Sequence, residues 1–152
     1  AAPGGWTQVA SKIVGKSGKV IAVDINHIKP FEMDNIFILQ ADMRGKQFHV
    51  LLNDIVKPPV DVVIADLASN TTGNWNLDSE RQIHLSSLAF ETSRLILKNE
   101  GNFITKVFRG TALKEFESEL KGNFANIRHW RPPATRKKSA EEYIICKGFI
   151  ND

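Results

Sequence analysis

The sequence is poor in several features that identify protein classes. It has one cysteine, Cys146, in 152 residues, so no disulfide can form within the chain and no cysteine cluster can bind a metal. Cys146 lies in the apolar run YIICKGF, which predicts a buried thiol in a reducing compartment. No apolar run reaches the roughly 18 residues that a membrane span requires, and no signal or transit peptide is visible. We therefore predict neither a metal site nor a membrane contact.

Neither sign of charge dominates the chain. Lys and Arg number 20 against 17 Asp and Glu, which gives a formal net charge of +3. So small an excess permits a nucleic acid partner without requiring one, and it makes the location of the basic residues more informative than their number. The hydrophobic content of 42% is enough for a core. The length, without repeats or low-complexity tracts, predicts a single domain over residues 1–152.

Four apolar runs rich in β-branched residues predict strands. They cover Lys19–Ile25, Asn35–Met43, Val60–Ser69 and Gly101–Gly110. Nearly continuous apolar composition is typical of parallel strands that are covered on both faces. The segments between them predict helices over Trp6–Val14, Gly45–Val56, Asp78–Leu97 and Thr111–Lys121, the last with Thr111 as its cap. This alternation predicts an α/β sheet built from right-handed crossovers.

The end of the chain departs from this alternation. FANIRHW and EEYIICKGF both resemble strands, and RPPATRKKSA joins them. A ten-residue connection with two prolines and four basic residues is typical of a loop, not of a crossover helix. We therefore predict that the last two strands form an antiparallel hairpin at one edge of the sheet.

Three of the apolar runs lead to an aspartate: Asp24, Asp42 and Asp66. Ligands of open α/β sheets bind beyond the carboxyl ends of the strands. A single aspartate at such a place is equally typical of a strand end or a helix cap. Three of them at the same relative place, behind a glycine-rich opening loop, predict a ligand site.

The opening loop AAPGGW does not match the dinucleotide fingerprint G-x-G-x-x-G, because the next glycine after Gly4 and Gly5 is Gly15. This mismatch argues against a nicotinamide-dependent oxidoreductase. Pro3 and Trp6 also stand where a phosphate-binding turn favours small residues. A ligand with a ribose and no phosphate is favoured instead, since Asp24 suits a ribose diol. S-adenosylmethionine has this composition.

Four motifs then suggest a family. AAPGGW, IADLASNTTG, ITKVFRG and RPPATRKKSAEEYIICKGF, in this order, resemble the FtsJ/RrmJ family of S-adenosylmethionine-dependent 2′-O-ribose RNA methyltransferases, from Ala1 to about Phe149. The resemblance implies a Rossmann-like class I methyltransferase fold, with a mostly parallel seven-stranded sheet and one antiparallel strand near an edge. It also implies a central first strand and an N-terminal helical region with a catalytic lysine. We expect both to be absent from this chain, so that the methyltransferase domain is N-terminally incomplete.

The resemblance implies a catalytic set Lys-Asp-Lys-Glu, whose last three members match Asp66, Lys106 and Glu141. Glu141 is chosen over Glu142 because it precedes Tyr143 by two residues, and strand alternation places the two glutamates on opposite faces. Lys106 lies in an apolar run, where a lysine is costly unless it is paired, and Asp66 and Glu141 supply the opposing charge. The alternative is an edge lysine that snorkels into solvent.

The resemblance also assigns ligand contacts. Gly4, Gly5 and Trp6 match the loop that passes the methionine part of S-adenosylmethionine, and Asp24 would accept from its ribose hydroxyls. Asp42 and Met43 match the adenine-contacting acid and its apolar neighbour, while Asp66 would lie near the sulfonium. The RNA-binding candidates are Arg109, Arg131, Arg136, Lys137 and Lys138, with ordinary solvated charge as the alternative. Trp75 and Trp130 are able to stack on bases, but each is equally suited to a core or a groove wall.

The predicted activity is 2′-O-ribose methylation of RNA. The favoured target is a uridine in the A-loop of the 23S rRNA within the ribosomal particle, with tRNA anticodon loops and mRNA caps as alternatives in the same family. A catalytically inactive RNA-binding module is the alternative from another class, because the first lysine has no counterpart. We expect a monomer in the cytoplasm of a bacterium, or in the mitochondria of a eukaryote.

Overall fold

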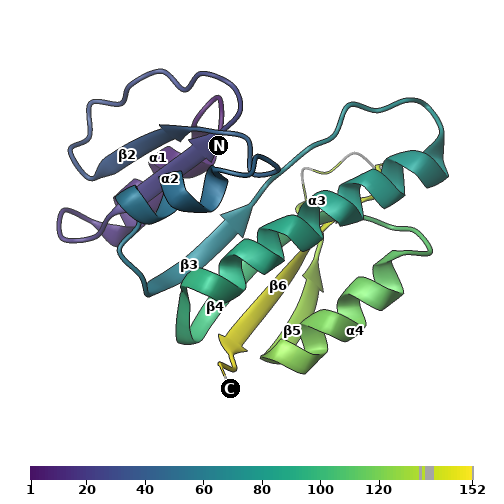
Figure 1. The fold of residues 1–152 in the computed structure, drawn as a ribbon. Coiled ribbons are helices and arrows are strands. Elements are labelled where there is room, and N and C mark those ends of the chain that lie inside the picture. Colours follow the sequence, from purple (N-terminus) through teal and green to yellow (C-terminus); the bar gives the residue numbers. More distant parts are fainter. Residues whose placement is uncertain (134, 136–138, 152) are drawn as a thin grey trace. The chain divides into compact units, whose positions relative to one another are not determined.

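The computed structural model describes residues 1–133, 135 and 139–151. It divides the chain into two compact units, the N-terminal unit Ala1–Lys57 and the C-terminal unit Pro58–Asp152 (Figure 1). The single domain over residues 1–152 stays a prediction. No helix in the described part of the chain is both long and apolar enough to cross a bilayer.

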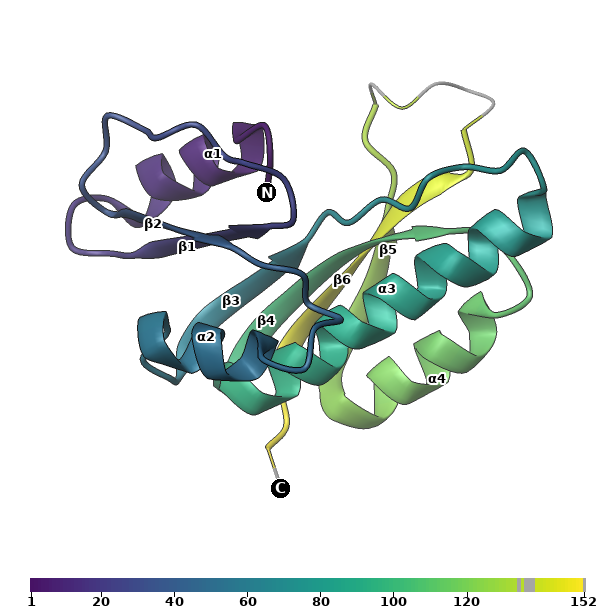
Figure 2. The ribbon, with the colours of Figure 1, turned by 45° about the horizontal axis from the view of Figure 1, so that its top comes forward.

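The N-terminal unit contains two helices and a pair of strands. Its elements are α1 (Gly5–Val14), β1 (Val20–Asp24), β2 (Ile36–Gln40) and α2 (Phe48–Ile55). The strands pair in parallel, as predicted, with Val20 opposite Ile36. Helix α1 packs against β1 (Figure 2). The buried apolar side chains of this unit are Ala22, Ile28, Phe48, Leu52 and Val56.

The C-terminal unit is a four-stranded sheet with two helices. Its elements are β3 (Val60–Ala65), α3 (Trp75–Ile96), β4 (Leu97–Phe108), α4 (Leu113–Asn123), β5 (Phe124–Trp130) and β6 (Glu141–Phe149). The strand order is β3-β4-β6-β5, with β3 and β4 parallel. Strand β6 is antiparallel to both of its neighbours. This confirms the predicted hairpin, which β5 and β6 form at the sheet edge. It also confirms a single antiparallel strand near that edge, which is β6 itself.

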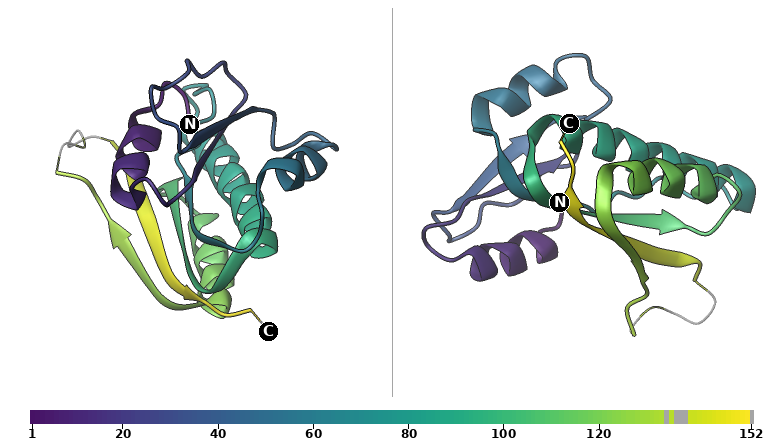
Figure 3. Two further views of the ribbon diagram at one scale, coloured as in Figure 1. Left: turned by 90° about the vertical axis from the view of Figure 1, so that its left-hand side faces the viewer. Right: turned by 90° about the horizontal axis from the view of Figure 1, so that it is seen from below.

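Helices α3 and α4 lie along the same face of this sheet (Figure 3). Phe90 of α3 is fully buried between them, with its ring centroid 5.6 Å from Phe103 of β4 and 5.8 Å from Phe124 of β5. Phe116 of α4 closes the cluster at 6.5 Å. Burial of these aromatic rings holds both helices to the sheet.

The described strands form two hydrogen-bonded sheets, and not the one sheet that the family resemblance implied. The described residues form six strands, two in the N-terminal unit and four in the C-terminal unit. The described part of the chain therefore has one strand fewer than the seven-stranded sheet that the resemblance implied. Strands β1 and β3 each have one strand neighbour, so each unit has its own hydrogen-bonded sheet.

Some element boundaries differ from the sequence prediction. Helix α3 begins at Trp75 instead of Asp78, because Asn74 caps it by accepting a hydrogen bond from the Leu77 N–H at 3.3 Å. The predicted cap Thr111 is wrong. Helix α4 begins at Leu113 with Ala112 at the N-cap position and without a side-chain cap. Helix α2 and strand β2 are shorter than predicted, since a turn from Asp42 to Gly45 separates them.

Candidate active site

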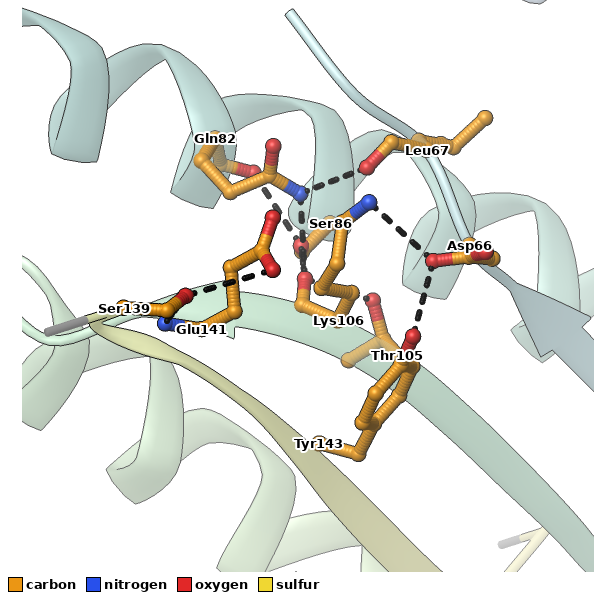
Figure 4. Close-up of polar contacts among 9 residues, drawn as sticks. All are labelled: Asp66, Leu67, Gln82, Ser86, Thr105, Lys106, Ser139, Glu141 and Tyr143. Atoms are coloured by element: carbon orange, nitrogen blue, oxygen red, sulfur yellow. Dashed lines mark hydrogen bonds and ion pairs between the residues drawn. The ribbon is translucent and has the colours of Figure 1, made fainter. Parts of the chain in front are cut away.

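Two of the predicted catalytic residues lie next to each other at the carboxyl ends of adjacent strands. Asp66 directly follows β3, and Lys106 lies near the end of β4. The Lys106 Nζ is 3.1 Å from the Asp66 Oδ1 (Figure 4). Lys106 is only 9% exposed, and a buried amine needs a partner of this kind. Lys106 is therefore a buried, paired lysine and not one that snorkels into solvent.

Tyr143 is a third member of this group, and no role was predicted for it. It lies opposite Lys106 on the neighbouring strand β6, and its hydroxyl donates to the Asp66 Oδ1 at 3.2 Å. Burial, with the negative charges of Asp66 and Glu141, raises the pKa of Tyr143 to about 12. The phenol therefore stays protonated at neutral pH and remains a donor. Asp66 is thus held by Lys106 and Tyr143 together.

The two glutamates that begin β6 point to opposite faces of the sheet, as strand alternation predicted. Glu141 is exposed and shares the face of Tyr143 (Figure 4). Among the described contacts its carboxylate partner is the Ser139 hydroxyl at 3.3 Å, and not Lys106. Of the predicted charge network, the structure therefore contains the Asp66–Lys106 pair, with Glu141 on the same face.

Glu142 is buried on the other face, where it joins three elements. Its Oε2 accepts from the Arg109 Nε at 3.2 Å, and its Oε1 lies 3.2 Å from the His129 Nδ1. The His129 Nε2 is in turn 3.2 Å from the Glu117 Oε1 of α4. This group ties β5, β6 and α4 together behind the face that carries Glu141.

Two polar side chains of α3 support the Asp66–Lys106 pair from behind. Gln82 is fully buried, and its Nε2 donates to the carbonyls of Leu67 at 2.9 Å and Lys106 at 3.1 Å. The Ser86 hydroxyl donates to the same Lys106 carbonyl at 2.8 Å. Helix α3 therefore connects the loop after Asp66 to the strand that carries Lys106 (Figure 4). The sequence signal was a set of polar residues four apart, Asp78, Gln82 and Ser86, on a buried helix face.

We expect Gln82→Leu to lower the free energy of unfolding by about 1–3 kcal/mol, because it leaves the partly buried Leu67 carbonyl without its donor. Leucine has a similar size but no group that can donate a hydrogen bond. Ser86→Ala is the matched smaller change, since the Lys106 carbonyl then keeps Gln82. We expect it to cost about 0.5–1.5 kcal/mol. Chemical denaturation of the full-length protein measures both, and an unchanged free energy for Gln82→Leu would contradict the role of this side chain.

Asp78 shapes the loop that follows Asp66. Its Oδ1 accepts from the backbone N–H and the hydroxyl of Thr72, both at 2.8 Å, and its Oδ2 accepts from the Gly73 N–H at 3.2 Å. These bonds, that of the Thr72 backbone first, lower the pKa of Asp78. The motif SNTTG is therefore folded back onto the start of α3, beside the Asp66–Lys106 pair.

In the N-terminal unit, the predicted cofactor loop leads directly into α1. Gly4 is the N-cap residue with φ +122°, a conformation that L side chains rarely adopt. A Cβ at this position would also collide with the ring of Phe31. Gly5 is the first residue of α1, and Trp6 is 40% exposed. The conformation of this loop therefore requires a glycine at position 4.

Asp24, the last residue of β1, binds the start of the same loop. Its Oδ2 accepts from the Ala1 nitrogen and from the Ala2 N–H at 2.7 Å, and its Oδ1 accepts from the Asn26 N–H at 2.8 Å. Burial alone would raise the pKa of Asp24, but these hydrogen bonds outweigh it and lower the pKa. A carboxylate has about four acceptor positions, so Asp24 retains one for a ligand hydroxyl.

Asp42 lies two residues beyond β2, which ends at Gln40 and not at the predicted Met43. Arg44 binds both oxygens of Asp42, with its Nη2 2.7 Å from Oδ2 and its Nε 2.9 Å from Oδ1. The hydrogen bonds from Arg44 lower the pKa of Asp42 to about 2. Met43 is half-buried. An adenine amino group would have to share Asp42 with Arg44.

The predicted RNA-binding residues are only partly described. Arg109 bonds to Glu142 but keeps its side chain 60% exposed. The Arg131 Nη2 donates to the Ser139 carbonyl at 2.7 Å. Arg136, Lys137 and Lys138 lie outside the described residues. The RNA-binding surface therefore stays a prediction.

Cys146 is a structural thiol, as predicted. It is buried in β6, and burial raises the pKa of its thiol to about 12, so it stays protonated. Within residues 1–133, 135 and 139–151, no group of three or more His, Cys, Asp and Glu side chains is placed to hold a metal ion.

Comparison with known proteins decides the family. A family model described as FtsJ-like methyltransferase matches residues 1–149. The chain belongs to this family. Ribosomal RNA large subunit methyltransferase E of Methanocaldococcus jannaschii is 40% identical over 153 residues, which are 97% of this chain and 62% of that protein. The protein of the same name from Halorubrum lacusprofundi is 39% identical over 150 residues, which are 98% of this chain and 56% of that protein. The chain thus spans about three fifths of the length of these FtsJ-like relatives.

Solved structures show the same fold. A Plasmodium falciparum protein assigned as a ribosomal RNA methyltransferase matches with a TM-score of 0.83 and 23% identity, over 97% of this chain and 82% of that one. Human methyltransferase-like protein 13 in complex with SAH matches with a TM-score of 0.63 and 20% identity, over 95% of this chain and 68% of that one. These likenesses confirm the predicted Rossmann-like methyltransferase fold.

Proposed function

We propose that the protein methylates a ribose 2′-hydroxyl in RNA, with S-adenosylmethionine as the methyl donor. The observation that carries this proposal is the ion pair between the buried Lys106 and Asp66 at the carboxyl ends of β3 and β4, in a chain of the FtsJ-like family. The names of the relatives favour large-subunit rRNA as the substrate. Within it we propose a uridine of the 23S A-loop, modified by a monomer acting on the ribosomal particle.

Each member of the site has a distinct task in this reaction. Lys106 orients the acceptor hydroxyl. Once its ammonium group has released a proton to solvent, the neutral amine takes up the hydroxyl proton as the oxygen attacks the methyl carbon. Asp66 fixes the Lys106 amine, and the Tyr143 hydroxyl fixes Asp66. Glu141 adds negative charge on the same face. Bound S-adenosylmethionine supplies an activated methyl group, so the new oxygen–carbon bond forms in line as the carbon–sulfur bond breaks. Positioning therefore carries much of the rate.

The residues of the N-terminal unit fit the proposed cofactor. Gly4, Gly5 and Trp6 form the loop for its methionine part, and Asp24 retains an acceptor position for a ribose hydroxyl. Asp42 and Met43 are proposed for the adenine.

We expect Asp24→Ala to weaken binding of S-adenosylmethionine and of its demethylated product by about tenfold to a hundredfold. The reason is that a charged acceptor for the ribose is lost, together with the bonds that hold Ala2. Isothermal calorimetry on the full-length protein measures this. Asp42→Asn is the comparison, and it should have a smaller effect because Asp42 is already occupied by Arg44. Tighter binding of NAD than of S-adenosylmethionine would refute the cofactor assignment.

The proposed RNA surface combines Arg109 and Arg131 with Arg136, Lys137 and Lys138, since arginine and lysine side chains bind phosphates. The protein would act in a compartment that contains ribosomes, either the bacterial cytoplasm or the mitochondrion. The test of the whole proposal is to incubate the full-length protein with labelled methyl donor and large ribosomal subunits, tRNA or capped mRNA. A methylated ribose resists alkaline cleavage at its own position, whereas methylation of a base would refute the proposal. Binding of RNA without any methyl transfer would instead favour an inactive RNA-binding module.

A further inference from the structure

An exposed aromatic pair adjoins the Asp66–Lys106 site. Trp130, the last residue of β5, lies opposite Tyr143 of β6, and the ring centroids are 6.0 Å apart at an interplanar angle of 46°. Trp130 is 43% exposed, a large apolar surface to leave in water. The Tyr143 hydroxyl bonds to the Asp66 Oδ1 at 3.2 Å. The aromatic surface therefore continues directly into the proposed site of methyl transfer.

Strand alternation decides which face of the sheet carries this pair. His129 precedes Trp130, and its Nε2 lies 3.2 Å from the Glu117 Oε1 of α4, so His129 points to the helix-covered face. Trp130 consequently points to the opposite face. Arg128, two residues earlier in β5, is exposed and shares the face of Trp130. An aromatic ring and a cation thus lie on the face that carries Tyr143 and Glu141.

We propose that Trp130, with Tyr143 beside it, is a stacking surface for an unpaired nucleobase of the RNA substrate. This inference rests on the proposed function. The base belongs to the acceptor nucleotide or to its immediate neighbour, because Tyr143 itself touches Asp66. Stacking on an aromatic ring is open to every base, since every base has a flat π-face. Arg128 on the same face supplies positive charge for a phosphate that flanks it. A base within a duplex has its faces covered by its neighbours, so the surface favours unpaired RNA.

The variants Trp130→Leu and Trp130→Phe in the full-length protein test this directly. Leucine keeps the apolar character without a π-face, whereas phenylalanine keeps a flat ring. The probe is a synthetic hairpin with an unpaired loop from large-subunit rRNA, and a fully paired duplex of the same strand is the comparison. We expect Trp130→Leu to weaken hairpin binding about tenfold at every salt concentration, because stacking releases no counterions. Trp130→Phe should recover most of the loss, and duplex binding should not change.

Trp75 offers a matched control in the same unit. It is 47% exposed, similar to Trp130, and stacks on Phe108 with centroids 5.8 Å apart. Trp75→Leu should leave hairpin binding within about twofold of the original protein. In methylation assays we expect Trp130→Leu to raise KM more than it lowers kcat, because the stacked base is bound before and during transfer.

Three results would overturn the inference: unchanged hairpin binding by Trp130→Leu, an equal loss with the duplex, or an equal loss with Trp75→Leu. If Trp130→Leu bound the hairpin normally but no longer methylated ribosomal subunits, Trp130 would contact a protein instead of RNA. The binding assay does not depend on turnover. If the protein binds the hairpin through Trp130 but methylates no RNA, only the proposed function is refuted. If the protein methylates RNA and the Trp130→Leu variant binds the hairpin normally, only this inference is refuted.

Discussion

Lys106→Ala in the full-length protein is expected to slow RNA methylation by about a hundredfold or more, while the affinity for S-adenosylmethionine stays nearly constant. Lys106 is the amine proposed to orient the acceptor hydroxyl, and its described partner is Asp66. Its loss therefore acts on the transition state for transfer and not on cofactor binding. Single-turnover methylation and calorimetry on the same preparation separate the two quantities.

Two further lysine variants sharpen this test. Lys106→Arg should not restore activity, because a guanidinium keeps its proton at working pH and its planar fork does not fit the place of an amine. Lys98→Ala is the matched control on the same strand. Lys98 is also paired with an aspartate, Asp61, but is 47% exposed and lies at the other end of β4. Activity should be normal in Lys98→Ala. Normal activity in Lys106→Ala would refute the assigned role.

The sequence predicted the parts of this site that depend on strand periodicity. Continuous apolar runs located β3 and β4, and parallel pairing then brought Asp66 and Lys106 to the same edge. Alternation along the strand places Glu141 and Glu142 on opposite faces. A shift of one residue along a strand would exchange its buried and exposed faces. The alternation of apolar and polar residues must therefore be written into the sequence, and this is why these features were predictable.

The contacts that the sequence did not reveal involve groups that no residue pattern specifies. Gln82 bonds to two backbone carbonyls, and every residue has a carbonyl, so its partners are visible only in the folded chain. Arg109 was predicted to contact RNA, yet it binds the buried Glu142, which lies 33 positions later in the chain. The cap of α4 was mispredicted because Thr111 suits an N-cap by residue type, while the turn from Gly110 to Leu113 starts the helix later.

The adjacent pair Glu141 and Glu142 should give opposite phenotypes. Glu142→Gln removes a buried negative charge from Arg109 and His129, so we expect the free energy of unfolding to fall by about 1–3 kcal/mol. The cost stays below that of a fully buried ion pair because the Arg109 and His129 side chains are 60% and 39% exposed. Methylation per folded molecule should be nearly unchanged, since Glu142 faces away from Lys106.

Glu141→Gln should behave in the reverse way. Its carboxylate is exposed and bonds to the Ser139 hydroxyl, so stability should change by less than about 0.5 kcal/mol. Methylation should fall about tenfold or more, because the variant removes negative charge from the face on which Lys106 receives a proton. Denaturation curves and initial rates on both variants measure the contrast. If Glu142→Gln lost activity without losing stability, and Glu141→Gln lost stability alone, β6 would present its other face to Lys106, and the catalytic assignment would pass to Glu142.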